Sequence, residues 1–240
     1  MQMGELHAIV IGGSGAVGSQ IVRLLASTDA YRTVLLLNRR QIQLDNEPQM
    51  QKIEQRIVDF DTIVDNHKKD FDGASVVFCA LGTTRAEAGA DGFYKVDHDY
   101  VVNCARAAHA AGVPHFSVVS SSGANENSSF LYVRTKGEME RDVSALNFEH
   151  CTIVRPAMLH GKRSRPRLLE RVVNFGIAPV KFFFPTKIAI SFESVAKAMI
   201  YDSLNLSEQK VRLVDNVELH KMAALYDEKY TSKAKGDTTS

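Results

Sequence analysis

The sequence has few cysteines, no excess of charge of either sign and no long apolar run. The spacings of Cys79, Cys104 and Cys151 fit neither a zinc site nor a redox pair, so we expect buried free thiols and no metal centre. With 29 basic and 28 acidic residues, the net charge of +1 gives no overall attraction to nucleic acid, and we expect no direct nucleic-acid binding. No apolar stretch is long enough to span a membrane. Because the first residues also lack a basic leader region, we expect a cytoplasmic protein, with the nucleus as an alternative location.

The chain instead alternates short, Ile- and Val-rich runs with segments of helical periodicity. The runs predict strands at Leu6–Ile11, Thr33–Leu37, Arg56–Phe60, Ser75–Leu81, His115–Ser120, Cys151–Val154 and Val211–Val214. Helices are expected at Ala16–Ser27, Tyr94–Ala111, Phe130–Leu146, Glu193–Leu204 and from Val217 onward. This alternation predicts an α/β fold of the Rossmann type: a doubly wound parallel sheet with helices on both faces.

Nothing in the composition divides the chain, so residues 1–240 are expected to form one NAD(P)-binding domain. The pattern loosens after Pro156, and residues from about 157 to 192 are expected to form a small, irregular substrate-side lobe. The stretch from about 231 to 240 has no apolar residue except alanine and is expected to be a frayed tail.

A glycine-rich turn follows the first predicted strand. Its sequence, Gly12-Gly-Ser-Gly-Ala-Val-Gly18, fits both the general dinucleotide fingerprint and the Gly-x-x-Gly-x-x-Gly spacing variant. Three glycines alone are weak evidence, but here they lie between a strand and a helix. Glycines let the backbone approach a pyrophosphate closely, and the helix N-terminus offers free amides and partial positive charge. The turn therefore predicts a nicotinamide dinucleotide site.

The end of the second predicted strand indicates which dinucleotide is bound. Asn38 lies 20 positions beyond Gly18, where NAD-binding proteins place an acidic residue, and Arg39 and Arg40 follow it. A carboxylate would repel a 2′-phosphate, whereas guanidinium groups bind one. We therefore expect NADP(H) rather than NAD(H), with solvated arginines as the plainer alternative.

Hydroxyl groups and a Tyr-x-x-x-Lys pair follow the fifth predicted strand. Tyr132 and Lys136 lie one turn apart on a predicted helix and thus share one face. Ser120, Ser121 and Ser122 cluster at the end of the preceding strand. This arrangement resembles the active site of the short-chain dehydrogenase/reductase superfamily. A free tyrosine is a poor base at neutral pH, and an adjacent ammonium group favours its phenolate form.

Four segments narrow that resemblance. They are Cys79–Arg85 (CALGTTR), Ala88–Val101 (AGADGFYKVDHDYV), Ser128–Glu140 (SSFLYVRTKGEME) and Val154–Pro166 (VRPAMLHGKRSRP). They resemble the atypical short-chain dehydrogenases of the Tat-interacting protein family (CC3-type oxidoreductases). The resemblance extends from about Ala8 to the last predicted helix.

The resemblance implies a role for each matching position. Gly12, Gly15 and Gly18 would form the dinucleotide turn, and Ser14, Ala16 and Val17 would line the pyrophosphate. Arg39 and Arg40 would bind the 2′-phosphate. Leu81 and Gly82 would contact the centre of the cofactor, and Leu159 and Arg165 its nicotinamide end. Tyr132 would exchange the proton, and Lys136 would bind the nicotinamide ribose.

A serine hydroxyl could donate to the substrate oxygen. We favour Ser121 for this role, with Ser120 as the alternative. Strand alternation lets only one of them face the site, and the sequence does not fix the register that decides which.

Two functions remain open at this point. The first is an NADPH-dependent oxidoreductase acting on a small carbonyl or alcohol. The second, which the resemblance implies, is a cofactor-sensing regulatory protein acting through protein partners in cell death, transcription or transport. The presence of Tyr132, Lys136 and the serines together favours the enzyme.

Overall fold

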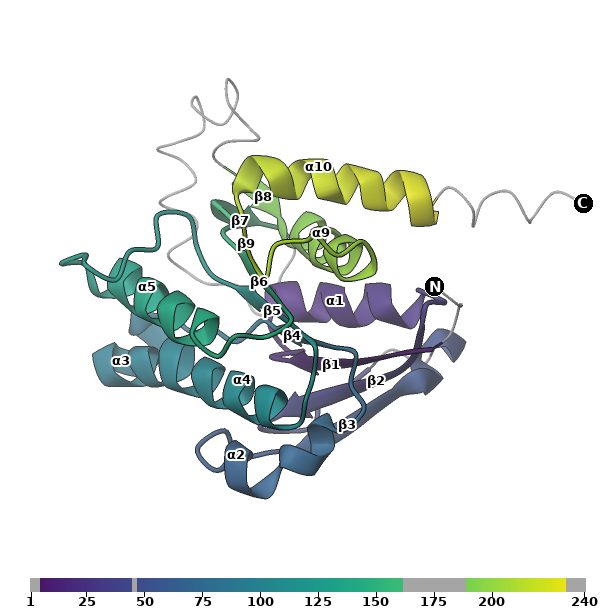
Figure 1. Cartoon of the computed structure of the whole chain (residues 1–240), viewed down its shortest axis with the longest axis horizontal. Helices are drawn as coiled ribbons and strands as arrows, with labels where there is room; N and C mark the ends of the chain where they lie inside the picture. Colours follow the sequence, from purple (N-terminus) through teal and green to yellow (C-terminus); the bar gives the residue numbers. More distant parts are fainter. Residues whose placement is uncertain (1–4, 45–46, 162–188, 232–240) are drawn as a thin grey trace, which may run out of the picture.

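The computed structural model describes residues 5–44, 47–161 and 189–231. In this part of the chain, seven parallel strands form one sheet in the order β3-β2-β1-β4-β5-β6-β9 (Figure 1). The strands are β1 (Leu6–Ile11), β2 (Tyr31–Asn38), β3 (Ile53–Ile57), β4 (Val76–Cys79), β5 (His115–Val119), β6 (His150–Val154) and β9 (Val211–Val214). The strand order reverses direction between β1 and β4, and such a reversal opens a crevice at the carboxyl ends of the strands.

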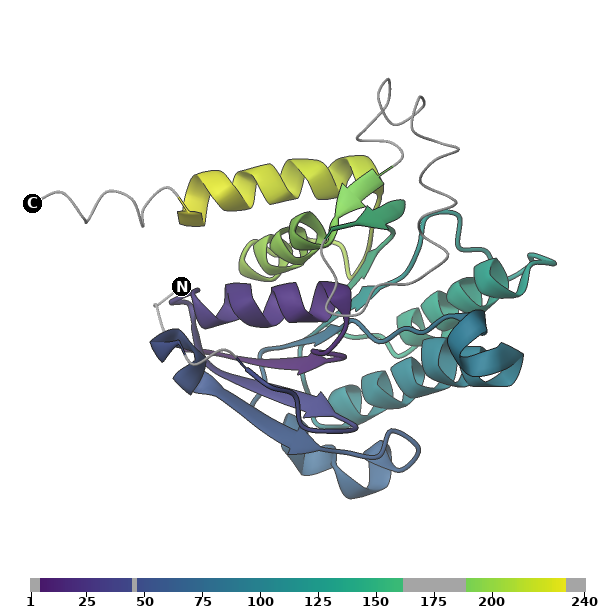
Figure 2. The same cartoon turned by 180° about the vertical axis from the view of Figure 1, so that it is seen from behind.

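Helices cover both faces of the sheet (Figures 1 and 2). One face carries α1 (Ala16–Ala26), α9 (Phe192–Leu204) and α10 (Asn216–Tyr226). The other face carries α2 (Ile63–Asn66), α3 (Arg85–Tyr94), α4 (Tyr100–Ala110) and α5 (Leu131–Ser144). A π-helical turn, η3 (Lys95–Asp99), joins α3 to α4. The predicted doubly wound Rossmann-type sheet is thereby confirmed.

Two apolar cores explain why the strands read as nearly continuous hydrophobic runs. Val10 on β1 belongs to the core under α1, α9 and α10, whereas its neighbours Ile9 and Ile11 belong to the core under α4 and α5. All three side chains are at most 2% exposed. A central parallel strand is buried on both faces, so alternation between apolar and polar residues disappears.

The third strand is displaced from its prediction. We expected Arg56–Phe60, and the strand spans Ile53–Ile57, paired with β2 from Val34↔Ile53 to Asn38↔Ile57. It lies at the edge of the sheet, so most of its side chains are at least partly exposed and can be polar. The apolar Val58 and Phe60, which drew the prediction onward, are buried just beyond its end.

Several smaller elements were not predicted. The helix expected at Tyr94–Ala111 is observed as η3 followed by α4. Helical structure also precedes it as α3, whose sequence is too polar to show an apolar stripe at helical spacing. Short 3₁₀ turns, η1 (Pro48–Lys52) and η2 (Lys68–Phe71), and a π-helical end, η4 (Asp227–Thr231), complete the observed elements. No helix in the described part of the chain has the length and apolar character needed to cross a membrane.

The three cysteines are buried free thiols, as predicted. Burial raises the pKa of Cys79 to about 11 and that of Cys151 to about 12. The expected substrate-side lobe lies mostly outside the described residues. Its described parts include β7 (Met158–His160) and β8 (Ala189–Ser191), which pair in parallel as a separate two-stranded sheet. The expected tail lies outside the described residues except for Thr231, so the predicted domain limits stay predictions.

Candidate active site

The glycine turn leaves β1 at Ile11 and packs tightly against both β4 and α1. Gly12 has a φ of +83°, and a Cβ there would lie 2.8 Å from the carbonyl carbon and oxygen of Ala80. A Cβ on Gly18, in the first turns of α1, would lie 2.1 Å from the carbonyl oxygen of Gly12. Gly13 differs, because a Cβ there would make only ordinary contacts, at 3.4 Å or more. The packing therefore requires the Gly12 and Gly18 positions and not Gly13, which fits the Gly-x-x-Gly-x-x-Gly spacing.

The first turn of α1 leaves its amides open. Gly15 is the N-cap residue and has no side chain that could bond them. Its own amide donates to the carbonyl of Gly12 at 2.9 Å, which closes the turn. Ser14 is exposed, Ala16 is partly exposed and Val17 is buried in the core. Uncapped amides at a helix N-terminus suit phosphate oxygens, so these residues fit a dinucleotide pyrophosphate.

The end of β2 lies next to this turn and carries a buried polar atom without a partner. Asn38 is buried, and its Nδ2 has no hydrogen-bond partner. Its Oδ1 lies 3.7 Å from where a Cβ on Gly13 would stand, so the amide faces the glycine turn. Arg39 and Arg40 are exposed. Within the described residues no carboxylate forms an ion pair with either arginine, which leaves both guanidinium groups available to an anion.

The loop after β4 borders the same crevice. Leu81 is partly buried and packs against the core under α4 and α5, while Gly82 is exposed. The next residue, Thr83, donates its amide to a carboxylate oxygen of Asp97 at 2.7 Å. Leu81 and Gly82 thus stand at the carboxyl end of a central strand, and their contact with a cofactor stays a prediction.

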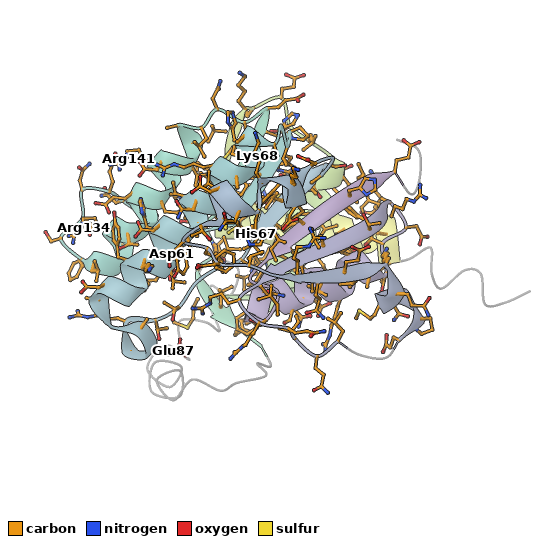
Figure 3. The ribbon with its side chains drawn as sticks, turned by 90° about the horizontal axis from the view of Figure 1, so that it is seen from below. Asp61, His67, Lys68, Glu87, Arg134 and Arg141 are labelled. Carbon is orange, nitrogen blue, oxygen red and sulfur yellow. The ribbon has the colours of Figure 1, made fainter. Side chains whose placement is uncertain are left out.

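The predicted Tyr-x-x-x-Lys pair lies on α5 in two contrasting environments. The Tyr132 side chain is half exposed, and its ring packs against Phe93 with 5.7 Å between centroids. Lys136, one turn later, is buried. Arg134 and Arg141 lie on the outer side of α5, away from the strands (Figure 3). The tyrosine side chain is thus open to solvent, whereas the lysine lies in the interior.

Sequence reasoning missed the partner of that lysine. Asp97, in η3, is buried, and its Oδ1 lies 2.8 Å from Nζ of Lys136. Burial is the largest single effect on the pKa of Lys136 and acts to lower it, but the charge and hydrogen bond of Asp97, together with Tyr132 and Cys79, raise the pKa overall. A signal was present in the sequence: Phe93, Asp97 and Val101 are spaced four residues apart, which places an acid on an apolar helix stripe.

The two candidate serines at the end of β5 face different surroundings. Ser120 donates its hydroxyl to the buried carboxylate of Glu140, which Arg155 also binds through Nε at 3.0 Å. Ser121 is buried too, but its Oγ has no hydrogen-bond partner. A structural partner therefore occupies Ser120, whereas the Ser121 hydroxyl remains available. Glu140, like Asp97, was not predicted from the sequence as a residue of the site.

The two positions predicted at the nicotinamide end have separate outcomes. Leu159 lies in β7, partly buried, and packs against the core under α1 and α9. Arg165 lies outside the described residues. Among the described residues, the glycine turn, Asn38, the serines and the α5 pair thus all lie at the carboxyl ends of the parallel strands.

Comparison with known proteins agrees with this arrangement. A protein family described as NAD(P)H-binding matches residues 12–201, so the chain belongs to that NAD(P)H-binding family. Within it, protein HTATIP2 of Rattus norvegicus is 33% identical over 215 residues, covering 90% of this chain and 88% of that protein. The resemblance inferred from the sequence segments is therefore confirmed.

Fungal relatives correct one expectation. Protein FMP52-1, mitochondrial, of Scheffersomyces stipitis is 38% identical over 174 residues, covering 72% of this chain and 75% of that protein. Relatives from Debaryomyces hansenii and Meyerozyma guilliermondii are also named mitochondrial. The cytoplasmic or nuclear location expected from the sequence is therefore wrong by this comparison. The expectation failed because it relied on two missing sequence patterns, a basic leader and a membrane-length apolar run, whereas these relatives carry a different location in their names.

Solved structures share the fold at low sequence identity. MoeE5 in complex with UDP-glucose and NAD superposes with a TM-score of 0.67 and 16% identity, covering 92% of this chain and 81% of that chain. A UDP-galactose 4-epimerase gives a TM-score of 0.61 and 17% identity, covering 88% and 76%. These likenesses identify a Rossmann-like dinucleotide-binding fold.

Proposed function

We propose that this protein is an NADPH-dependent oxidoreductase that interconverts a small carbonyl compound and its alcohol. The observation that carries the proposal is the Tyr132–Lys136 pair: a half-exposed phenol one helical turn from a buried, ion-paired ammonium group. A protein that only sensed the cofactor would not need a tyrosine presented in this way. The pair stands at the edge of the sheet where the glycine turn and Ser121 also lie.

The chemistry follows from the positions of these groups. A nicotinamide dinucleotide held by the glycine turn and Lys136 would supply the hydride for reduction of the carbonyl, or take up the hydride of the alcohol in the reverse direction. The Tyr132 hydroxyl donates a proton to the oxygen that becomes the alcohol, and the same group as phenolate removes that proton in the reverse direction. Lys136, one turn away on α5, would bind the nicotinamide ribose. The free hydroxyl of Ser121 donates a hydrogen bond to the same substrate oxygen.

The preference for NADPH rests on the end of β2. Asn38 stands where an acidic side chain would exclude a 2′-phosphate, and its unpartnered Nδ2 is a donor near the glycine turn. Arg39 and Arg40 are exposed beside it and can bind a phosphate bidentately. The resemblance to NAD-bound enzymes does not extend to this preference, which is inferred from these three side chains.

A carbonyl-substrate screen tests the proposal. Wild type and Tyr132→Phe would be compared with NADPH and NADH across aldehydes, ketones and the matching alcohols. Turnover by wild type with NADPH should fall by about 10²- to 10⁴-fold in Tyr132→Phe, as expected for loss of a general acid. Tyr201→Phe, on α9 at the opposite face of the sheet, is the matched control and should keep full activity.

The screen also decides the regulatory hypothesis. If wild type binds NADPH tightly but turns over none of these substrates, the enzyme proposal fails and a cofactor-sensing protein acting through protein partners replaces it. Equal turnover by wild type and Tyr132→Phe would likewise remove Tyr132 from the reaction.

A further inference from the structure

A carboxylate behind the active-site lysine joins three elements of the fold. Asp97 lies in the middle of the π-helical turn η3, and its side chain is about 3% exposed. Its Oδ1 bonds Nζ of Lys136 on α5 at 2.8 Å, and its Oδ2 accepts the amide of Thr83, from the loop after β4, at 2.7 Å. Both oxygens of the carboxylate are therefore engaged, each by a different element.

The pair is more than an ordinary structural ion pair. Two buried charges lose their hydration, and such pairs often stabilise a fold no better than apolar residues of similar size would. An ammonium group also has three donors. Of the oxygens in the described part of the chain, only Asp97 Oδ1 is bonded to Lys136 Nζ. The ammonium group therefore has donors left for which the described residues supply no acceptor.

We propose that Asp97 is a positioning residue that holds the Lys136 ammonium group charged and aimed, and that ties it to the cofactor-facing loop after β4. Its effect on catalysis rests on the function proposed above. Its effect on the lysine itself does not, because the ion pair joins two side chains of the chain itself.

Electrostatics supports the geometry. Burial by itself lowers the pKa of Lys136, and the charge and hydrogen bond of Asp97 act against it, joined by Tyr132 on α5 and Cys79 on β4, so that the pKa is raised overall. These three groups are the titratable ones that face the ammonium group from η3, α5 and β4. Once Asp97 loses its charge, burial dominates, so the pKa of Lys136 should fall below its ordinary value.

The test is the variant Asp97→Asn, which keeps the size of the side chain and an oxygen for the Thr83 amide. Carbon-13 NMR of the Lys136 side chain, assigned with Lys136→Met, would follow its titration without ligand. We expect the Lys136 pKa to drop by roughly 1–3 units, as is typical when an opposite charge at this distance is removed. NADPH affinity, measured by fluorescence, should then weaken with rising pH over a correspondingly lower range than in wild type.

Asp99→Asn is the matched control. Asp99 lies two residues away in the same turn, is about half exposed and bonds His98 at 2.8 Å. It should leave both the lysine titration and the pH dependence of NADPH affinity unchanged.

Each outcome decides the inference. If Asp97→Asn lowers stability but leaves the Lys136 titration unchanged, Asp97 is only structural and the proposal is overturned. If the variant does not fold, wild type alone still decides, because a Lys136 pKa below that of a free lysine would contradict the proposal. If wild type binds no NADPH, the proposed function fails, while the titration without ligand still tests the role of Asp97.

Discussion

Two polar regions of this protein differ in how completely their hydrogen bonds are satisfied. At the carboxyl ends of the strands, Asn38 Nδ2 and Ser121 Oγ are buried without a partner. Beneath α9, three buried groups bond one another: His115 Nε2 lies 3.0 Å from Thr152 Oγ1, and Thr152 donates to Asp202. We call the first region, with its unpartnered atoms, the open edge, and the second, whose three groups bond one another, the closed network.

The difference separates binding groups from structural ones. A buried polar group without a partner costs about 1–3 kcal/mol, so it persists where another molecule completes it. The closed network beneath α9 needs no such molecule, since Arg212 also binds the Asp202 carboxylate. Unpartnered buried atoms also occur elsewhere, at Ser117 on β5 and at Thr135 and Glu138 on α5, but those of Asn38 and Ser121 lie at the edge that carries the glycine turn. Four predictions test this contrast.

The largest effect is expected from the two serines. Ser121→Ala should lower turnover by about 10²- to 10³-fold, as loss of a donor to the substrate oxygen does, and leave stability almost unchanged because no protein hydrogen bond is lost. Ser120→Ala should show the reverse: a loss of about 1–3 kcal/mol of stability, since Glu140 loses a donor, with a smaller effect on turnover. Steady-state kinetics and urea unfolding would measure both.

The two serine variants are expected to have opposite effects on turnover and on stability, and this opposition is what tests the assignment. If Ser120→Ala removed turnover while Ser121→Ala left it intact, the open hydroxyl would not be the donor. The assignment of Ser121 would then be wrong.

The second prediction concerns the glycine turn. Gly18→Ala should lower the free energy of unfolding by about 3 kcal/mol or more, because its Cβ would lie 2.1 Å from backbone that cannot move aside easily. Gly13→Ala is the matched control, because its Cβ would make ordinary contacts, and its stability should stay close to that of wild type. Chemical denaturation of both variants would compare them. Equal losses would contradict the steric distinction between the two spacings.

Much of this edge could be predicted from the sequence because local patterns encode it. A glycine turn between a strand and a helix, and a Tyr-x-x-x-Lys pair on one helix, are contiguous motifs. β1 was predicted with its observed bounds for the same reason, since a central strand is apolar throughout. The edge strand β3 was displaced because polar side chains conceal a half-exposed strand.

The rest of the site depends on contacts between distant segments. Asp97 lies 39 residues before Lys136 in the chain, and Ser120 lies 20 residues before Glu140. No local sequence pattern indicates which carboxylate contacts which partner. The sequence likewise left Ser120 as the alternative to Ser121; the contact with Glu140 distinguishes their surroundings, and which serine acts on a substrate stays a prediction.

The third prediction tests the open edge by its ligand. Arg39→Ala and Arg40→Ala should each weaken NADPH binding by about ten- to a hundredfold, the effect of losing a charge-assisted hydrogen bond, and leave NADH binding nearly unchanged. Arg32→Ala, an exposed arginine near the amino end of the same strand, is the control and should affect neither. Isothermal titration calorimetry would measure the dissociation constants. Equal affinities of wild type for the two nucleotides would refute the proposed preference.

The smallest effect is expected from His115 in the closed network, and it is a change of stability with pH. Burial, with a contribution from His150, lowers the pKa of His115 to about 3. A depressed histidine pKa means that the unfolded chain binds a proton below about pH 6.5 that the folded chain refuses. Stability is therefore lost as the pH falls from about 6.5 towards 3, and His115 contributes a loss of about 2 kcal/mol at pH 5. Burial raises the pKa of Asp202, so protonation of this carboxylate acts in the opposite direction at lower pH.

The variant His115→Gln isolates that contribution, because glutamine cannot take up the proton but can still bond Thr152. Unfolding free energies of wild type and variant would be measured at pH 7 and pH 5. Wild type should lose about 2 kcal/mol more than the variant over this interval, while NADPH affinity at pH 7 should be the same for both. If the two proteins lost stability in parallel, His115 would be protonated in the folded state, and the network beneath α9 would be as open as the edge that binds the dinucleotide.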